Sequence, residues 1–306
     1  MFHVKPGGHM SFSLDDDTPL AAAAKAAVYV RTGLMGTFPA PARTRVMTIV
    51  NQKGGVGKTT TAVNIAATMA LSGLNVLLID LDMQGNASTA LGIEHEEGTP
   101  GTYDVLIEGA DIADLVVSAE GFETLKCLPA TIDLAGAERE LGGENDSEWP
   151  YLLKNAIESY VAGNDVDYIF IDCPPSLGRL TVNALVAVSE VLVPIQCEFY
   201  ALEGVQQLMQ TVDLVRTNLN PHLEISTILL TMFQGSTNLS AQVAQEVRAF
   251  FGEKVLEAVI PRNIYVAEAP SHGQSVMTYD PGSTGAVAYL AAAREIAERG
   301  KNNGGK

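Results

Sequence analysis

The chain has 306 residues, of which 47% are hydrophobic and 18% are charged, and its formal net charge is −17. This apolar fraction excludes intrinsic disorder over most of the chain, and the length suits one large α/β domain or two small ones. No segment approaches the roughly 20 uncharged apolar residues that a membrane-spanning helix needs. The three cysteines form no Cys-x-x-Cys pair, which argues against a disulfide framework and a zinc site. We therefore expect a cytosolic protein.

The acidic charge is concentrated in one part of the chain. Residues 94–148 contain fifteen Asp and Glu and only two basic residues, a net charge of −13. The last 106 residues contain ten acidic and eight basic residues. We interpret the acidic region as a solvated surface. No block of basic residues indicates a nucleic-acid partner.

Residues 1–45 differ in composition from the rest of the chain. They contain two Pro- and Gly-rich stretches, and between them Thr18-Pro19 opens an Ala-rich segment that ends at Gly33. A cap residue, a proline at the first helical position and a closing glycine predict one short helix. The segment lacks the bulky apolar run of a secretory signal. We expect an N-terminal extension over 1–45 that is flexible apart from this helix.

From residue 46 onward, short apolar runs alternate with segments of helical spacing. The runs 46–50, 76–79, 168–171, 191–193 and 225–232 are typical of strands buried on both faces of a sheet. Helical spacing is found in 58–71, 180–188, 202–219, 240–251 and 284–299. This alternation predicts an α/β fold, a doubly wound, mainly parallel sheet with helices on both faces. Ligands of such folds bind at the carboxyl ends of the strands.

The strongest motif follows the first predicted strand. Its residues are Gln52-Lys53-Gly54-Gly55-Val56-Gly57-Lys58-Thr59-Thr60. Glycines let successive backbone N–H groups point at phosphate oxygens, and the next helix adds its positive N-terminal end. Lys58 is placed to reach the β- and γ-phosphates of a nucleotide, and the Thr59 hydroxyl is placed to ligate Mg²⁺. Strand, loop, Lys-Thr and helix occur in the order that phosphate binding requires.

This loop departs from the usual phosphate loop in one respect. Gln52 replaces the first glycine, and Lys53 adds a second lysine. The pattern resembles the deviant Walker A loop of the ParA/MinD superfamily of P-loop ATPases. The resemblance implies ATP and Mg²⁺ as cofactors and nucleotide contacts along residues 53–60. It also implies a homodimer with ATP, in which Lys53 reaches the nucleotide of the partner subunit.

Two further motifs extend the resemblance, which covers residues 46–300. Asp80-Leu81-Asp82-Met83-Gln84-Gly85-Asn86 resembles the family's first switch, where Asp82 orients the attacking water near Mg²⁺. Phosphoryl transfer depends mostly on such positioning and on charge. Tyr168 to Ser176 resembles the Walker B strand and the second switch, with Asp172 near the metal. The family usually has proline where this chain has Met83.

The C-terminal half resembles the chromosomal ParA branch. Gln196 to Gly204 and Ile260-Pro261-Arg262-Asn263 both match it, and the resemblance places Pro261 and Asn263 in the adenine pocket. Cys173 and Cys197 fall inside these motifs, and we interpret them as packing residues. The resemblance implies a deviant Walker ATPase domain over 46–300 and a flexible tail over 301–306.

The chain lacks basic residues that the family uses to hold non-specific DNA. The family usually has arginine where this chain has Ser236, Tyr265, Gly282 and Thr284. Non-specific affinity comes mainly from neutralised phosphates, so DNA binding should be weakened. Cations that remain as substitutes lie in the extension and elsewhere on the surface: Lys5, Lys25, Arg31, Arg43, Arg45, Arg179, Arg248, Lys254 and Arg262.

Two functions fit these observations. The first is a slow, partner-stimulated ATPase that dimerises with ATP and segregates or positions chromosomal DNA with a ParB-type partner. It is expected in the cytoplasm, on the nucleoid if DNA binding is retained. The alternative is a ParA-like positioning switch for cargo or division machinery that does not bind DNA strongly. A membrane-bound MinD-like ATPase needs an amphipathic C-terminal helix with bulky apolar residues, and 294–306 offer only Ile296. An iron–sulfur carrier of the same superfamily does not fit the cysteine spacing.

Overall fold

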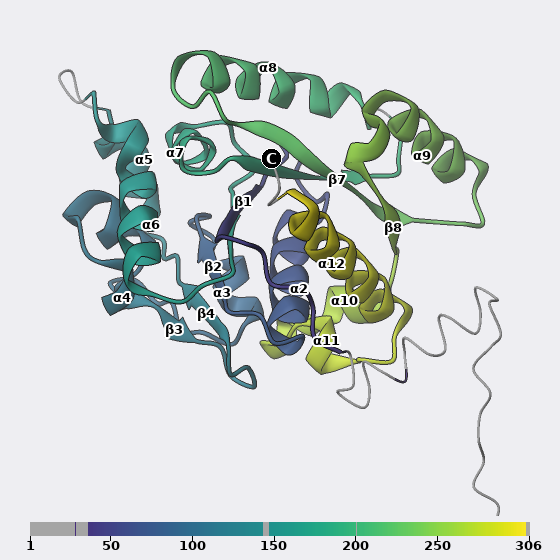
Figure 1. The fold of residues 1–306 in the computed structure, drawn as a ribbon, viewed down its shortest axis with the longest axis horizontal. Coiled ribbons are helices and arrows are strands. Elements are labelled where there is room, and N and C mark those ends of the chain that lie inside the picture. The colour runs from purple at the N-terminus through teal and green to yellow at the C-terminus, as the bar shows by residue number, and fades with distance from the viewer. Residues whose placement is uncertain (1–27, 29–35, 143–146, 200, 304–306) are drawn as a thin grey trace, which may run out of the picture.

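The computed structural model describes residue 28 and residues 36–142, 147–199 and 201–303. The helix expected within 18–33 therefore lies, but for Val28, outside the described residues. The described part folds around one sheet (Figure 1).

The sheet has eight strands within the described residues, in the order β3-β4-β2-β5-β1-β6-β7-β8. Neighbouring strands pair in parallel, except that β3 runs antiparallel to β4. Central strands are rich in Val, Ile and Leu, as strands buried on both faces must be. The strands are β1 (Arg45–Ile49), β2 (Val76–Asp80), β3 (Val117–Ser118), β4 (Leu125–Leu128), β5 (Tyr168–Asp172), β6 (Glu190–Gln196), β7 (Glu224–Phe233) and β8 (Val255–Pro261).

Helices connect the parallel strands. They are α2 (Lys58–Leu71), α3 (Asn86–Ala90), α4 (Ile112–Leu115), α5 (Leu134–Glu140), α6 (Leu152–Gly163), α7 (Arg179–Ala187), α8 (Glu203–Asn218), α9 (Asn238–Phe251), α10 (Ile264–Glu268), α11 (Val276–Tyr279) and α12 (Thr284–Asn303). Short turns of other helix types are η1 (Asp104–Glu108), η2 (Trp149–Tyr151), η3 (Gly252–Lys254) and η4 (Ala269–His272). The doubly wound fold class is thereby confirmed.

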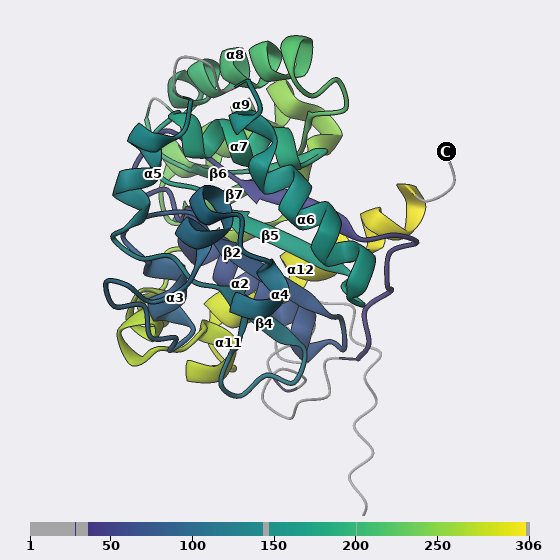
Figure 2. The same ribbon diagram turned by 90° about the vertical axis from the view of Figure 1, so that its left-hand side faces the viewer.

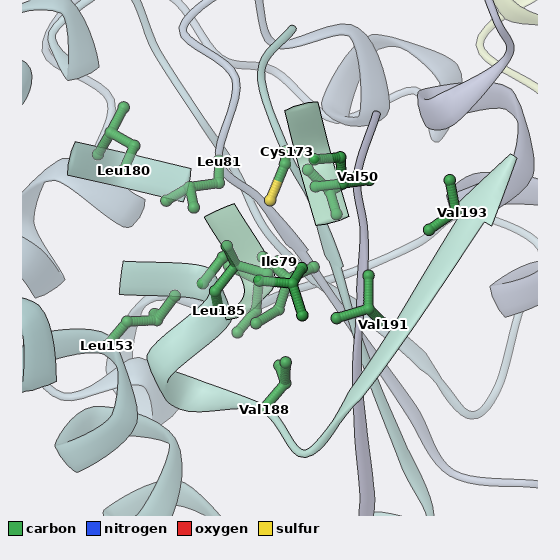
Figure 3. Close-up of a cluster of buried hydrophobic side chains, with 14 of the residues drawn as sticks. Val50, Ile79, Leu81, Leu153, Cys173, Leu180, Leu185, Val188, Val191 and Val193 are labelled. Atoms are coloured by element: carbon green, nitrogen blue, oxygen red, sulfur yellow. The ribbon is translucent and has the colours of Figure 1, made fainter. Parts of the chain in front are cut away.

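The two faces of the sheet carry separate cores. On one face, α5, α6, α7, α8 and α9 pack on the sheet, and part of this core is drawn in Figure 3. On the other face lie α2, α3, α11 and α12. Figure 2 shows α5 and α6 in front of the strands and α2 and α12 behind them. Because the faces are covered, the carboxyl edge of the strands is the place left for a ligand.

The ten elements expected from the sequence are present, with bounds that differ by at most four residues. The largest difference is at α12, which continues to Asn303, past the expected domain end at residue 300. Several elements were not expected: β3, β4 and β8, and the helices α3 to α6, α10 and α11.

Cysteine and membrane expectations can be compared with the structure directly. Cys127, Cys173 and Cys197 are all buried and free, which confirms that the last two are packing residues. No helix in the described part of the chain is both long and apolar enough to cross a membrane.

Arg45 corrects one sequence expectation. It was expected among the cations available for DNA, but it begins β1 and forms an ion pair with Glu190 at 2.6 Å, with side chains 10% and 14% exposed. Its guanidinium also donates to the Ile296 carbonyl at 2.8 Å. A side chain engaged in this way is not a free surface cation, so Arg45 cannot serve as a substitute.

Candidate nucleotide-binding site

The loop between β1 and α2 is held in shape by the neighbouring strands. The Asn51 amide donates to the Pro194 carbonyl at 2.8 Å and accepts from the Lys53 N–H at 3.0 Å. The Thr231 hydroxyl donates to the Val56 carbonyl at 2.9 Å. Gly57 has φ +88°, a left-handed conformation that side chains other than glycine's rarely adopt. The loop is therefore a preformed turn that leads into the N-terminus of α2.

Lys58 opens α2 and is nearly buried, with 7% of the residue exposed. Burial lowers the pKa of its ammonium group, and the negative charges of Asp172 and Asp82 partly offset this effect. A buried cation is costly unless anionic groups face it. Nucleotide phosphates at the loop would supply that charge, so the position of Lys58 fits phosphate binding.

Asp172, at the end of β5, is completely buried. Neither of its carboxylate oxygens has a hydrogen-bond partner among the described residues. Burial raises its pKa well above the usual value, the nearby Asp80 adds to the rise, and the Thr59 hydroxyl counteracts it. Unpaired buried oxygens beside a hydroxyl form an oxygen donor set suited to a hard cation.

The described residues contain no group of three or more His, Cys, Asp or Glu that could hold a metal by themselves. This agrees with Mg²⁺ chemistry, because Mg²⁺ at nucleotide sites is usually bound by one or two carboxylates together with substrate phosphates. Thr59, Asp82 and Asp172 therefore fit a Mg²⁺ ion that arrives with a nucleotide. No protein cage is needed.

Asp82 lies in the turn after β2 and is 7% exposed. Its carboxylate accepts from the Gln84 N–H at 3.1 Å, and its carbonyl accepts from the Gly85 N–H at 2.8 Å. These two bonds fix the turn that carries the carboxylate. The Leu81 N–H donates to the Asp172 carbonyl at 3.0 Å, which joins the turn to the end of β5.

The sequence reasoning gave no role to Asp80, the residue that anchors this turn. Its carboxylate accepts from the Ser88 N–H at 2.9 Å, the Ser88 hydroxyl at 2.8 Å and the Asp82 N–H at 3.2 Å. Burial raises the pKa of Asp80, and the bonds from Ser88 oppose the rise. In the sequence, the feature that could have indicated a role for Asp80 is its place as an acidic residue at the end of an otherwise apolar strand. Its partner on α3 was not recognisable from the sequence.

Lys53 lies at the surface of the same edge. Its side chain is 40% exposed, and its Nζ is 3.9 Å from an oxygen of Glu198. Glu198 also lies 3.5 Å from the Arg262 guanidinium. Exposed pairs of this kind contribute little to stability. Lys53 is therefore free to change partners.

Pro261 and Asn263 lie at the end of β8. The Asn263 carbonyl oxygen accepts from the N–H groups of Tyr265 and Val266, and its amide donates to the Thr284 hydroxyl at 3.0 Å. Asn263 thus caps α10. Its contact with adenine remains a prediction.

The four positions expected to carry arginine in relatives are all exposed: Ser236, Tyr265, Gly282 and Thr284. Ser236 follows β7, and Tyr265 follows β8. Gly282 precedes α12, and Thr284 begins it and accepts a hydrogen bond from the Asn263 amide. Two of the cations considered above as replacements for these arginines, Arg248 and Arg179, form hydrogen bonds within the subunit. The Arg248 guanidinium donates to the carbonyls of Leu256 and Glu257, and that of Arg179 donates to the Glu138 carbonyl.

Comparisons with known proteins agree with this geometry. Residues 44–225 match the family model described as an AAA domain. The chain is 50% identical over 256 residues to the sporulation initiation inhibitor protein Soj of Bacillus subtilis, covering 84% of this chain and 99% of Soj. It is 50% identical over 262 residues to the chromosome partitioning protein ParA of Caulobacter vibrioides, covering 86% and 97% of the two chains.

Solved structures show the same architecture with nucleotide. A structure described as cobyrinic acid a,c-diamide synthase from Mycobacterium smegmatis with bound ADP and magnesium is 38% identical, with a TM-score of 0.69 over 83% of this chain and 93% of that one. The septum site-determining protein MinD from Pyrococcus horikoshii with Mg-ADP is 26% identical, with a TM-score of 0.65 over 83% and 96%.

Proposed function

Since this chain belongs to the ParA family of chromosome-partitioning ATPases, we propose that it binds ATP as a dimer and segregates or positions chromosomal DNA with a ParB-type partner. It is an ATPase that uses ATP and Mg²⁺. The M. smegmatis structure has a biosynthetic name, but at 38% identity it is less similar than the partitioning relatives. The single observation that carries the proposal is the meeting of Lys58, Asp82 and Asp172 at one sheet edge.

The residues of this edge divide the reaction between them. Backbone N–H groups of Gly54, Gly55, Val56 and Gly57 and of Thr60 would surround the phosphates, with Pro261 and Asn263 beside the base. Lys58 holds the β- and γ-phosphates, and Asp82 orients the attacking water. Mg²⁺, held by Thr59, Asp82 and Asp172, would neutralise charge on the phosphates. Hydrolysis then yields ADP and phosphate.

Dimerisation with ATP is proposed from the position of Lys53. Among the described residues, its exposed side chain has a weak partner in Glu198, 3.9 Å away. A cation supplied from another subunit stabilises the charge of phosphoryl transfer without disturbing the binding loop. A slow reaction that a partner stimulates also fits an exposed lysine that must be brought into place.

A Lys53→Ala variant tests this function. Dimerisation with Mg-ATP, measured by light scattering, and ATP hydrolysis should both fall about tenfold or more, because cations supplied in trans are worth up to 10⁵-fold in phosphoryl transfer. ADP binding should be retained. Lys126→Ala, at an exposed position on β4, is the control. A wild-type protein that stays monomeric with Mg-ATP contradicts the proposal.

The finer assignments are part of the proposal. We propose an ATPase domain that runs from β1, which begins at Arg45, to the end of α12 at Asn303, preceded by the N-terminal extension. We place the protein in the cytoplasm, and on the nucleoid where it binds DNA. The ParB-type partner is inferred from the partitioning relatives named above. DNA binding is proposed to be weak.

A second function is favoured by one observation. Ser236, Tyr265, Gly282 and Thr284 are exposed and uncharged. A positioning switch for cargo or division machinery needs the ATP-dependent dimer but not the phosphate contacts of DNA. The salt dependence of DNA binding separates the two functions.

A further inference from the structure

The helix α7, which follows the β5–α7 loop (residues 173–178), is capped from a distant part of the chain. Its N-cap is Gly178, which has no side chain to cap with. The Glu138 carboxylate of α5 takes this place: the Arg179 N–H donates to it at 3.0 Å and the Leu180 N–H at 3.3 Å. A carboxylate satisfies free N–H groups at a helix N-terminus and suits the positive end of the helix dipole.

The surrounding residues are shaped for this contact. A Cβ atom at Gly178 would lie 2.5 Å from one Glu138 oxygen and 2.9 Å from the other, so glycine permits the close approach. The Arg179 guanidinium donates back to the Glu138 carbonyl at 3.0 Å. Three hydrogen bonds thus join α5, within the acidic region, to the first turn of α7. Such a number of contacts indicates a specific junction between the two helices.

The first turn of α7 is hydrogen-bonded to the C-terminal part of the β5–α7 loop. The Thr181 hydroxyl of α7 donates to the Ser176 carbonyl at 2.7 Å. At the near end, the Cys173 N–H donates to the Ile49 carbonyl at 3.3 Å, directly after Asp172. Leu180 belongs to the same buried cluster as Leu81 and Cys173 (Figure 3). The loop beside the nucleotide site is therefore fixed at both ends.

We propose that Glu138 is a positioning residue for ATP hydrolysis, which acts through the first turn of α7 to hold the β5–α7 loop beside Asp172 and Asp82. The inference rests on the proposed ATPase function and adds a residue outside the phosphate-binding motifs. Loss of the cap leaves Lys58, Thr59 and the phosphate loop in place. It should therefore slow the turnover of bound ATP more than it weakens nucleotide binding.

Glu138→Ala in the full chain is the test, with Glu140→Ala as the matched control. Glu140 lies on the same helix and carries the same charge, but its carboxylate accepts from the Tyr103 hydroxyl, at 3.2 and 3.3 Å, and not from α7. We expect kcat of Glu138→Ala to fall about fivefold, the factor that one helix cap represents, with the dissociation constant of ADP within about twofold of wild type. Glu138→Gln keeps an acceptor oxygen and should lie between wild type and Glu138→Ala.

Hydrogen–deuterium exchange supplies a readout that does not depend on turnover. Amide exchange in a peptide spanning 173–182 should be about fivefold faster in Glu138→Ala than in Glu140→Ala. A purely structural role would instead weaken ADP binding and kcat together. If Glu138→Ala does not fold, Glu138→Gln carries the same comparison.

The outcomes are distinguishable. If wild type hydrolyses ATP and Glu138→Ala matches Glu140→Ala in kcat and exchange, the positioning role is wrong and the proposed function stands. If ADP affinity falls as much as kcat, Glu138 is structural, and the inference is again wrong. If wild type does not hydrolyse ATP, the proposed function itself fails and the inference fails with it.

Discussion

The two lysines of the phosphate loop, Lys58 and Lys53, differ in burial, and this difference indicates different roles. Lys58 is almost buried, and its pKa is lowered by burial, whereas Lys53 is 40% exposed beside Glu198. A buried cation that faces carboxylates is placed to hold a ligand permanently, and an exposed one can exchange partners. We therefore propose that Lys58 binds the nucleotide and that Lys53 acts in dimerisation.

Lys58→Ala should strongly weaken nucleotide binding itself. Without the ammonium group, the charge of the β- and γ-phosphates is left uncompensated next to Asp172 and Asp82. We expect the affinity for Mg-ADP to fall about 100-fold, the scale of an unpaired buried charge. Isothermal titration calorimetry measures this, with Lys126→Ala as the control. Retained affinity would mean that backbone N–H groups alone hold the phosphates.

Asp82→Ala should separate binding from chemistry. Lys58 and Thr59 still hold the nucleotide, but the carboxylate that orients the water is lost, so hydrolysis should fall about 100-fold or more. The variant should then accumulate as the ATP-bound dimer. Light scattering together with a phosphate-release assay checks both outcomes. Undiminished turnover would show that another group positions the water.

Local sequence predicted the elements that carry the phosphate loop but missed others for physical reasons. Apolar runs and helical spacing were enough for β1, whose last three residues are buried, and for α2, which has 14 residues. In β4 the exposed Lys126 interrupts a strand of only four residues, and in β8 the exposed Glu257 interrupts a strand of seven. Helices of four or five residues, such as α3 and α10, are too short to show a period.

The site was predictable only where its chemistry is local. Lys58 and Thr59 follow the phosphate loop in sequence, so spacing alone identified them. Asp80 is recognisable only through Ser88, which comes eight residues later, and Glu138 only through the N–H groups of α7, 41 and 42 residues away. Contacts of this separation depend on the fold. A single sequence without structure does not contain them.

One partly buried ion pair reinforces the apolar packing of α12 on the sheet. Arg45 on β1 bonds to Glu190 on β6 and to the Ile296 carbonyl of α12. Arg45→Ala leaves the partly buried carboxylate of Glu190 unpaired, which should lower the free energy of unfolding by about 2 kcal/mol. Arg43→Ala, exposed two residues away, should change it by less than about 0.5 kcal/mol. Equal denaturation midpoints for the two variants would contradict this account.

For the whole molecule, charge should decide whether the proposed ATP dimer holds DNA. The net charge is −17, and the acidic region sits within 94–148 on the α4 and α5 side. The exposed positions after β7 and β8 carry Ser236 and Tyr265 instead of arginine. Of the cations named as substitutes, Arg45, Arg179 and Arg248 are engaged in bonds within the subunit. Arg262 remains exposed at the sheet edge near Glu198.

DNA affinity of the ATP dimer should therefore be weak and depend little on salt. Each phosphate contact contributes about 0.9 to the slope of log affinity against log salt concentration. Ser236→Arg with Tyr265→Arg adds two cations per subunit, so the dimer should gain affinity and its slope should steepen by about 3 to 4. A salt titration by fluorescence anisotropy with Mg-ATP measures both quantities. Ser236→Gln with Tyr265→Gln is the matched control, because it adds length without charge. A steep slope for wild type would show that other cations hold the phosphates. Repeating the titration after deletion of residues 1–35, which spares the buried Phe38 and Arg45 of β1, would then locate them in or outside that segment.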